Sequence, residues 1–125
     1  MTQADIVFHW QKGARESMQL AEKAHEMGSF TLALFHCQLA VEKALKALYI
    51  EQHGEDAPRT HELQILAEHV QHHLAEEQIA QLDELTNYSV GARYDEIEWS
   101  AAYATEENSA LWLDRTRSLL SALLP

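Results

Sequence analysis

The residues best suited to chemistry in this sequence lie in the stretch Ser89–Ser100, where helical periodicity fails and we predict a loop. Arg93 and Tyr94 are adjacent there. An arginine side chain is a permanent, bidentate donor to phosphate, and a tyrosine ring can stack on a base. The pair is therefore a candidate site for a nucleotide or an RNA end. The alternative is that Arg93 forms an ion pair with one of the nearby acids, Asp95, Glu96 or Glu98.

Lys43 and His61 are two further candidate ligand-binding residues. Lys43 lies on a helix that we predict over Ser29–Gly54, and the alternative for its ammonium group is plain solvation. His61 follows Thr60, the predicted N-cap of a short helix. It is therefore either a surface residue of the first turn or a polar group that faces the end of the central helix. Composition alone does not choose between these two interpretations.

The remaining histidines and the single cysteine give little support for a metal site. His69, His72 and His73 have helical spacing, but the last two are adjacent and diverge by about 100° around a helix axis. The cluster has no cysteine partner, and no HExxH pattern occurs. Cys37 lies among small apolar residues, which is typical of a buried thiol. We therefore predict a solvated helix end, no metal, no cofactor and no catalytic residues.

Length and composition indicate one all-helical domain that spans residues 1–125. Hydrophobic residues make up 46% of the chain, with only four glycines and two prolines. The net charge of -11 argues against broad nucleic-acid binding, which needs many lysines and arginines, but it leaves room for a local cationic pocket. No apolar run approaches the roughly 20 residues of a membrane span. We expect no membrane contact and a cytoplasmic location.

The predicted helix over Ser29–Gly54 is the centre of the fold, because two apolar rows run along it at helical spacing. The bulky row is Leu34, Val41, Leu45 and Leu48, and the row of small residues is Ala33, Cys37, Ala40, Ala44 and Ala47. They leave a narrow polar strip with Glu42, Lys43 and Lys46. Glu42 and Lys46 have the i,i+4 spacing and order of a favourable helical ion pair, and we expect the two lysines to be solvated. A helix this apolar must be packed on several sides.

The other predicted helices surround this one. The first covers Ala4–Met27, and the link Gly28-Ser29 is so short that it must turn back antiparallel on the central helix. Further helices are predicted from Thr60, over Glu76–Tyr88 and from Thr105 onwards. The predicted fold class is all-α, a four- to five-helix up-and-down antiparallel bundle.

The run Gln38–Ala47 resembles the signature of the HEPN domain family. Three other matches follow the order expected for that family: Trp10 in the first helix, Thr60–Leu63 at the start of the third, and Arg93–Asp95 before the last. The resemblance implies a helical bundle that often dimerises and is frequently encoded beside a minimal nucleotidyltransferase. It also implies that some relatives are toxins of toxin–antitoxin pairs.

Many toxins of this family are metal-independent RNases that use an arginine followed, after four to six residues, by a histidine. None of the arginines here has a histidine at those positions. Cleavage by the 2′-OH needs a group that moves a proton near neutral pH, for which histidine is suited. We therefore favour a binding module over an enzyme. The alternative is a divergent RNase toxin with a histidine from elsewhere, such as His61 or His36, and a third hypothesis is a purely structural bundle.

Overall fold

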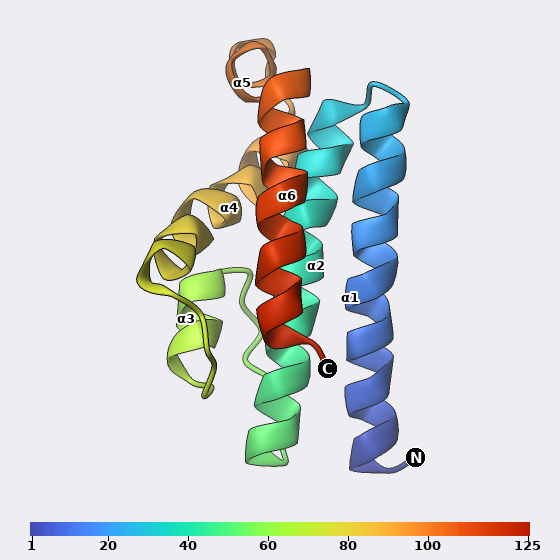
Figure 1. Cartoon of the computed structure of the whole chain (residues 1–125), viewed down its shortest axis with the longest axis vertical. Coiled ribbons are helices and arrows are strands. Elements are labelled where there is room, and N and C mark those ends of the chain that lie inside the picture. The colour runs from blue at the N-terminus through green and yellow to red at the C-terminus, as the bar shows by residue number, and fades with distance from the viewer.

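Helix α2 (Phe30–His53) runs through the middle of the molecule, between α1 (Gln3–Glu26) and α6 (Glu106–Leu123) (Figure 1). The computed structural model describes all residues, Met1–Pro125. The other helices are α3 (Leu63–Glu68), α4 (Glu76–Tyr94) and α5 (Ile97–Tyr103), and there are no strands. The prediction of an all-α bundle is confirmed. There are six helices, one more than predicted, because α5 is a separate short helix that precedes α6 in the chain.

The hairpin of α1 and α2 follows from local signals. A capping box of Thr2 and Asp5 begins α1, and Gly28 takes a positive φ of 78° in the turn to α2. Small residues are buried on both helices, which lets them lie side by side over their whole length (Figure 1). At the other end of α2, Gly54 adopts the left-handed conformation with φ 71° and its N–H group bonds to Ile50.

The core lies where α2, α3, α4 and α6 meet. The bulky row predicted on α2 contributes Leu34, Val41 and Leu45, all fully buried, while Leu48 is partly buried at the edge. Trp112 of α6 is also fully buried and is the largest such side chain. The other helices contribute a set of leucines with no exposed surface: Leu63, Leu66, Leu82, Leu85 and Leu119. Cys37 is buried as predicted.

The predicted loop over Ser89–Ser100 is wrong, because α4 continues to Tyr94 and α5 begins at Ile97. A contact between the two helices accounts for the difference. The ring of Trp99 on α5 lies directly against the backbone of α4 at Gly91, in the place where any other residue would have its side chain. Trp99 also packs against Tyr88 and Tyr103. This packing joins two consecutive helices across the break at Asp95 and Glu96, so it does not show as one continuous helical periodicity.

Two predicted helix caps also differ from the structure. Ser29 occupies the N-cap position of α2, but its side chain makes no capping hydrogen bond. Thr60 is not the N-cap of α3, which begins at Leu63 after Glu62; its hydroxyl accepts a hydrogen bond from the Glu62 N–H instead. Thr105 does cap α6, accepting from the Asn108 N–H at 3.1 Å. No helix in the chain is both long and apolar enough to span a membrane.

The contact between Gly91 and Trp99 leads to a testable prediction. A Cβ atom at Gly91 would lie 2.0 Å from the Trp99 ring, so Gly91→Ala should displace α5 and lower the free energy of unfolding by about 1–3 kcal/mol. Denaturant unfolding followed by tryptophan fluorescence measures this loss.

The matched control is Gly13→Ala in the interior of α1. There the added Cβ atom would meet only the flexible Lys43 side chain, at 3.1 Å. Since alanine favours a helix over glycine by roughly 1 kcal/mol, this variant should be neutral or slightly more stable. Equal destabilisation of the two variants would contradict our account of α5.

Candidate functional site

Glu42 is the one charged residue that the fold buries. Its side chain on α2 is only 5% exposed and accepts three hydrogen bonds. The donors are Gln38 Nε2 at 3.1 Å, Lys46 Nζ at 3.1 Å and His61 Nδ1 at 2.8 Å. Gln38, Glu42 and Lys46 lie one helical turn apart on the same side of α2. We call these four residues the Glu42 cluster.

Two opposing effects act on the Glu42 carboxyl group. Burial by itself raises the pKa of a carboxyl group, because it disfavours the charged form. The hydrogen bonds from His61, Gln38 and Lys46, together with the positive charge of Lys46, outweigh burial and leave the pKa of Glu42 below its ordinary value. Glu42 is therefore an ionised, fully paired acceptor, which suits it to hold other groups in place and not to take up a proton.

Lys46 is held under an aromatic ring as well as by Glu42. Its Nζ atom lies 5.7 Å from the centre of the Trp10 ring, and its side chain is only 13% exposed. The prediction that the lysines of the polar strip are solvated is therefore wrong for Lys46. The predicted i,i+4 ion pair of Glu42 and Lys46 is present, but α1 and the segment before α3 cover it.

His61 lies in the segment before α3 and is 61% exposed. One ring nitrogen donates to Glu42, and the main-chain oxygen of His61 accepts from Gln38 at 3.0 Å. Of the two interpretations of this residue, contact with the central helix is the one that the structure shows. The contact is made near the middle of α2 and not at its end. The other ring nitrogen makes no hydrogen bond within the chain.

Lys43 follows Glu42 on α2. Its side chain packs against α1 at Gly13, where the absence of a side chain leaves space for it. No carboxylate lies within ion-pairing distance of its ammonium group. Seven residues earlier on α2, His36 has a buried Nδ1 atom without a hydrogen-bond partner. Burial, and then the positive charge of Lys43, lower the pKa of His36. Lys43 therefore offers an unpaired positive charge beside an uncharged imidazole.

Arg93 and Tyr94 form the last turn of α4 instead of a loop. Both are exposed, Tyr94 by 73%. The predicted alternative for Arg93, an ion pair with Asp95, Glu96 or Glu98, does not form. Asp95 instead takes a left-handed conformation that ends α4, and its carboxylate accepts from the Thr31 hydroxyl at 3.2 Å. The Arg93 guanidinium is thus free to bind a ligand.

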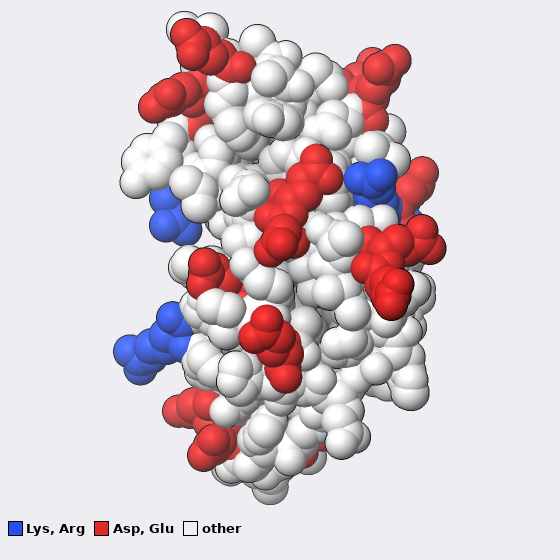
Figure 2. Space-filling view, turned by 90° about the vertical axis from the view of Figure 1, so that its left-hand side faces the viewer, with Lys and Arg blue, Asp and Glu red and all other residues white.

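The four predicted site residues lie in two places. Asp95 places the end of α4 against Thr31, at the start of α2. Lys43 is twelve residues further along α2, roughly 18 Å at the helical rise of 1.5 Å per residue. Lys43, which packs against Gly13 of α1, and His61, which bonds to Glu42, therefore both lie near the middle of α2, whereas Arg93 and Tyr94 lie near its start. On the side of the molecule where α3 and α4 lie, acidic side chains are widely spread and basic ones are few (Figure 2).

Sequence reasoning missed Gln38 and the burial of Glu42. The signal was a run of polar residues spaced by four on an otherwise apolar helix. Sequence reasoning also missed Tyr88, whose hydroxyl accepts from Trp112 Nε1 at 3.0 Å and from Asn108 Nδ2 at 3.2 Å. Burial raises the pKa of Tyr88. This hydroxyl joins α4 to α6 within the core and serves the fold.

Two of the three histidines considered as metal ligands, His69 and His72, bind the main chain. His69 Nδ1 donates to the Ile65 carbonyl at 2.8 Å, and His72 Nδ1 accepts from the Leu74 N–H at 3.1 Å. No three groups of the kind that ligate metals lie close enough together to hold an ion.

The model of the HEPN domain family matches residues 7–124 of this sequence, and the chain therefore belongs to that family. Among solved structures, the fold is similar to that of TT1696 from Thermus thermophilus, with a TM-score of 0.81 and 24% sequence identity. The match covers 92% of this chain and 93% of TT1696, and at this identity it establishes a common fold only. No curated protein matches the sequence.

The Glu42 cluster predicts a pH-dependent stability. Because the folded chain lowers the pKa of Glu42, the ionised carboxylate stabilises the fold above its ordinary pKa of 4.5, and this contribution is lost as the pH falls through the lowered value. Glu42→Gln should cost about 2 kcal/mol at neutral pH. The difference in unfolding free energy between wild type and variant should shrink on acidification below about 4.5.

Glu16→Gln is the matched control, since Glu16 forms an exposed i,i+4 pair with Lys12 at 3.9 Å. Its stability should change by less than about 0.5 kcal/mol. Urea unfolding over a range of pH measures both variants. A pH-independent difference for Glu42→Gln would show that its carboxylate is not the stabilising group.

Proposed function

We propose that this protein is a cytoplasmic binding module that forms a homodimer and pairs with a minimal nucleotidyltransferase in a toxin–antitoxin-like system. Membership of the HEPN family supports the proposal that the chain is a HEPN-type module. The observation that carries the proposal is an open apolar face on α2, the helix that the rest of the bundle surrounds. A nucleotide or an RNA end is the proposed ligand of Arg93 and Tyr94.

The open face of α2 is formed by Leu32, Phe35 and Leu39, which share one side of the helix at spacings of three and four. Leu32 is 53% exposed, and the other two are partly buried. Leu20 and Met27 of α1 continue the surface, and with Leu32 they line a hollow of about 170 Å³.

A second copy of the chain fits this face because an isologous dimer places the same surface on both sides of the interface. An almost wholly apolar helix is normally covered all round, and an exposed apolar patch of this kind marks an interaction site. Dimerisation through α2 would complete the burial of that helix.

The ligand proposal rests on the free guanidinium of Arg93 beside an exposed tyrosine ring. Arg93 would hold phosphate, and Tyr94 would stack on a base. Lys43 lies too far along α2 to complete this site within one chain, and His61 is bonded to Glu42 near the middle of that helix. The alternative, a divergent RNase toxin, would need a histidine near Arg93. His61 instead donates to Glu42, near the middle of α2.

The proposed dimer predicts that Leu32→Glu converts the protein to a monomer, because it would bury two charges in a symmetric apolar interface. Size-exclusion chromatography with light scattering gives the mass. Ile79→Glu on α4 is the control, since Ile79 is 41% exposed and lies away from this face, and it should remain a dimer. A monomeric wild type would overturn the proposed dimer.

The proposed ligand site predicts that Arg93→Gln weakens ATP binding about tenfold or more, the loss expected for one charge-assisted contact to phosphate. Arg59→Gln is the control, because Arg59 is also exposed and forms no ion pair. Isothermal titration with ATP tests both variants. Equal affinities of wild type and Arg93→Gln would remove Arg93 from the site.

The partner is tested separately, by co-purification with the protein encoded by the adjacent gene. Recovery of a nucleotidyltransferase supports the two-component proposal. Recovery of the homodimer alone, with RNA cleavage on expression that Arg93→Gln abolishes, would favour the RNase.

A further inference from the structure

Helix α5 is apolar in composition but buries none of its side chains. Five of its seven residues are apolar, and the helix lies at one end of the bundle (Figure 1). Trp99 holds it against α4 at Gly91. Ile97 is 87% exposed, and Ala101, one turn later on the same side, is exposed as well. Single exposed apolar residues are normal, but an apolar helix without any buried residue is typical of an interaction surface.

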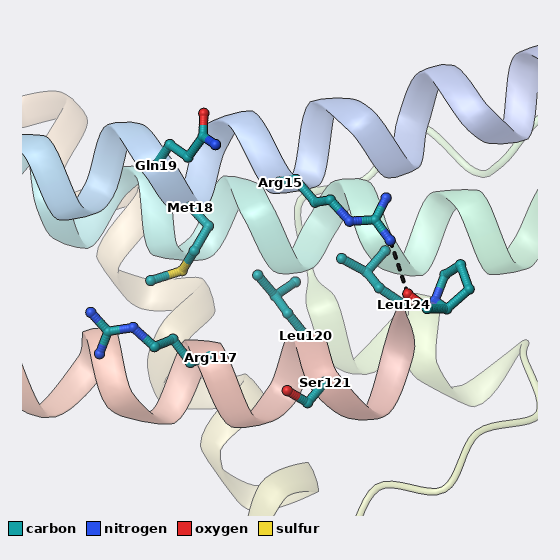
Figure 3. A pocket seen from close by; sticks show the side chains of 8 residues that line it. Arg15, Met18, Gln19, Arg117, Leu120, Ser121 and Leu124 are labelled. Atoms are coloured by element: carbon teal, nitrogen blue, oxygen red, sulfur yellow. Dashed lines mark hydrogen bonds between the residues drawn. The ribbon is translucent and has the colours of Figure 1, made fainter.

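The junction between α1 and α6 shows the difference. There Met18 and Leu120 are each only 7% exposed, and Arg15 Nη2 donates to an oxygen of Pro125 at 3.0 Å (Figure 3). Contacts within the chain therefore cover the apolar side chains of that junction. The outer side of α5 has no such cover.

A hollow of about 420 Å³ lies between α5 and α4. Its lining includes Trp99 and Tyr103 of α5 and Val90 of α4. Tyr103 is 43% exposed and Val90 is 56% exposed, so this lining is accessible to another molecule. No lysine or arginine lines the hollow. Aromatic rings attract the positive end of a lysine or arginine side chain, and the hollow therefore suits such a side chain from outside.

Acidic residues surround this surface. The segment Glu76–Glu107 contains nine acidic residues and one basic residue, Arg93. Figure 2 shows acidic side chains spread over this side of the molecule. Glu84 lines the hollow and is 54% exposed, and its 3.8 Å distance from Arg115 is too long for a hydrogen bond. The surface thus attracts a basic partner, and it repels both an anionic membrane and the same surface of a second copy.

We propose that α5 and the adjoining end of α4 form a docking surface for a basic, apolar segment of another protein. Apolar side chains of that segment would cover Ile97 and Ala101 and remove them from water. A lysine or arginine of the segment would enter the hollow, against the rings of Trp99 and Tyr103 and close to Glu84. The inference does not rest on the proposed dimer or nucleotide site, because it uses none of their residues.

An amphipathic helical peptide of leucines and lysines is the probe, and ¹H–¹⁵N NMR spectra of the isotope-labelled protein locate where it binds. The peptide should shift the amide signals of α5 and of α4 around Val90. A peptide with glutamate in place of every lysine should not shift them. Equal binding of the two peptides, or the absence of any shift, would overturn the inference. Shifts confined to α2 around Phe35 would do so too, because they would place the peptide on the open face of that helix.

Ile97→Ser should weaken binding of the basic peptide about tenfold or more, the loss expected when an isoleucine side chain is no longer buried. Phe8→Ser is the control, since Phe8 is 61% exposed near the start of α1, at the other end of the molecule (Figure 1). Both side chains are exposed, so both variants should fold. Equal affinities of the two variants would contradict the proposed surface.

Glu98→Lys should weaken binding about fivefold, because it reverses a charge beside Ile97. Glu51→Lys makes the same change in net charge near the end of α2 and should bind the peptide as the wild type does. Equal weakening would show that net charge alone attracts the peptide. Light scattering should give Ile97→Ser the same mass as the wild type, and a lower mass would make a second copy the occupant and overturn the inference.

Discussion

The structure depends on the need to cover α2, a helix with apolar residues around most of its circumference. Small residues let α1 lie along one side of it, and leucines of α3, α4 and α6 fill another. The side with Leu32, Phe35 and Leu39 has no helix over it in the single chain. The same apolar pattern that organises the fold thus supplies the surface through which we propose that two copies associate.

A second constraint comes from the one carboxylate placed on this helix where water cannot reach it. A buried charge must be paired, and Glu42 is paired with Lys46 on its own helix and with His61 from the segment before α3. These bonds tie that segment to α2. The cluster therefore positions the start of α3, and Lys43 is left unpaired beside it.

Positive charges are few in this acidic chain, and two that lack a carboxylate partner lie in different surroundings. Arg93 is exposed next to an exposed tyrosine, whereas Lys43 is half-buried against Gly13 of α1. Their separation argues for distinct local sites and against one broad surface for nucleic acid.

The sequence by itself determined the features that depend on neighbouring residues. It located α1 and α2, the glycine turn between them, the left-handed end at Gly54, the buried thiol and the family, since periodicity, capping and ordered motifs are local properties. Only the tertiary structure decided that Glu42 and Lys46 are buried, that α4 continues beneath Trp99, and that Lys43 and Arg93 lie far apart. Each of these depends on packing between different elements, and such contacts override local preference because burial and pairing contribute more free energy than helix propensity does.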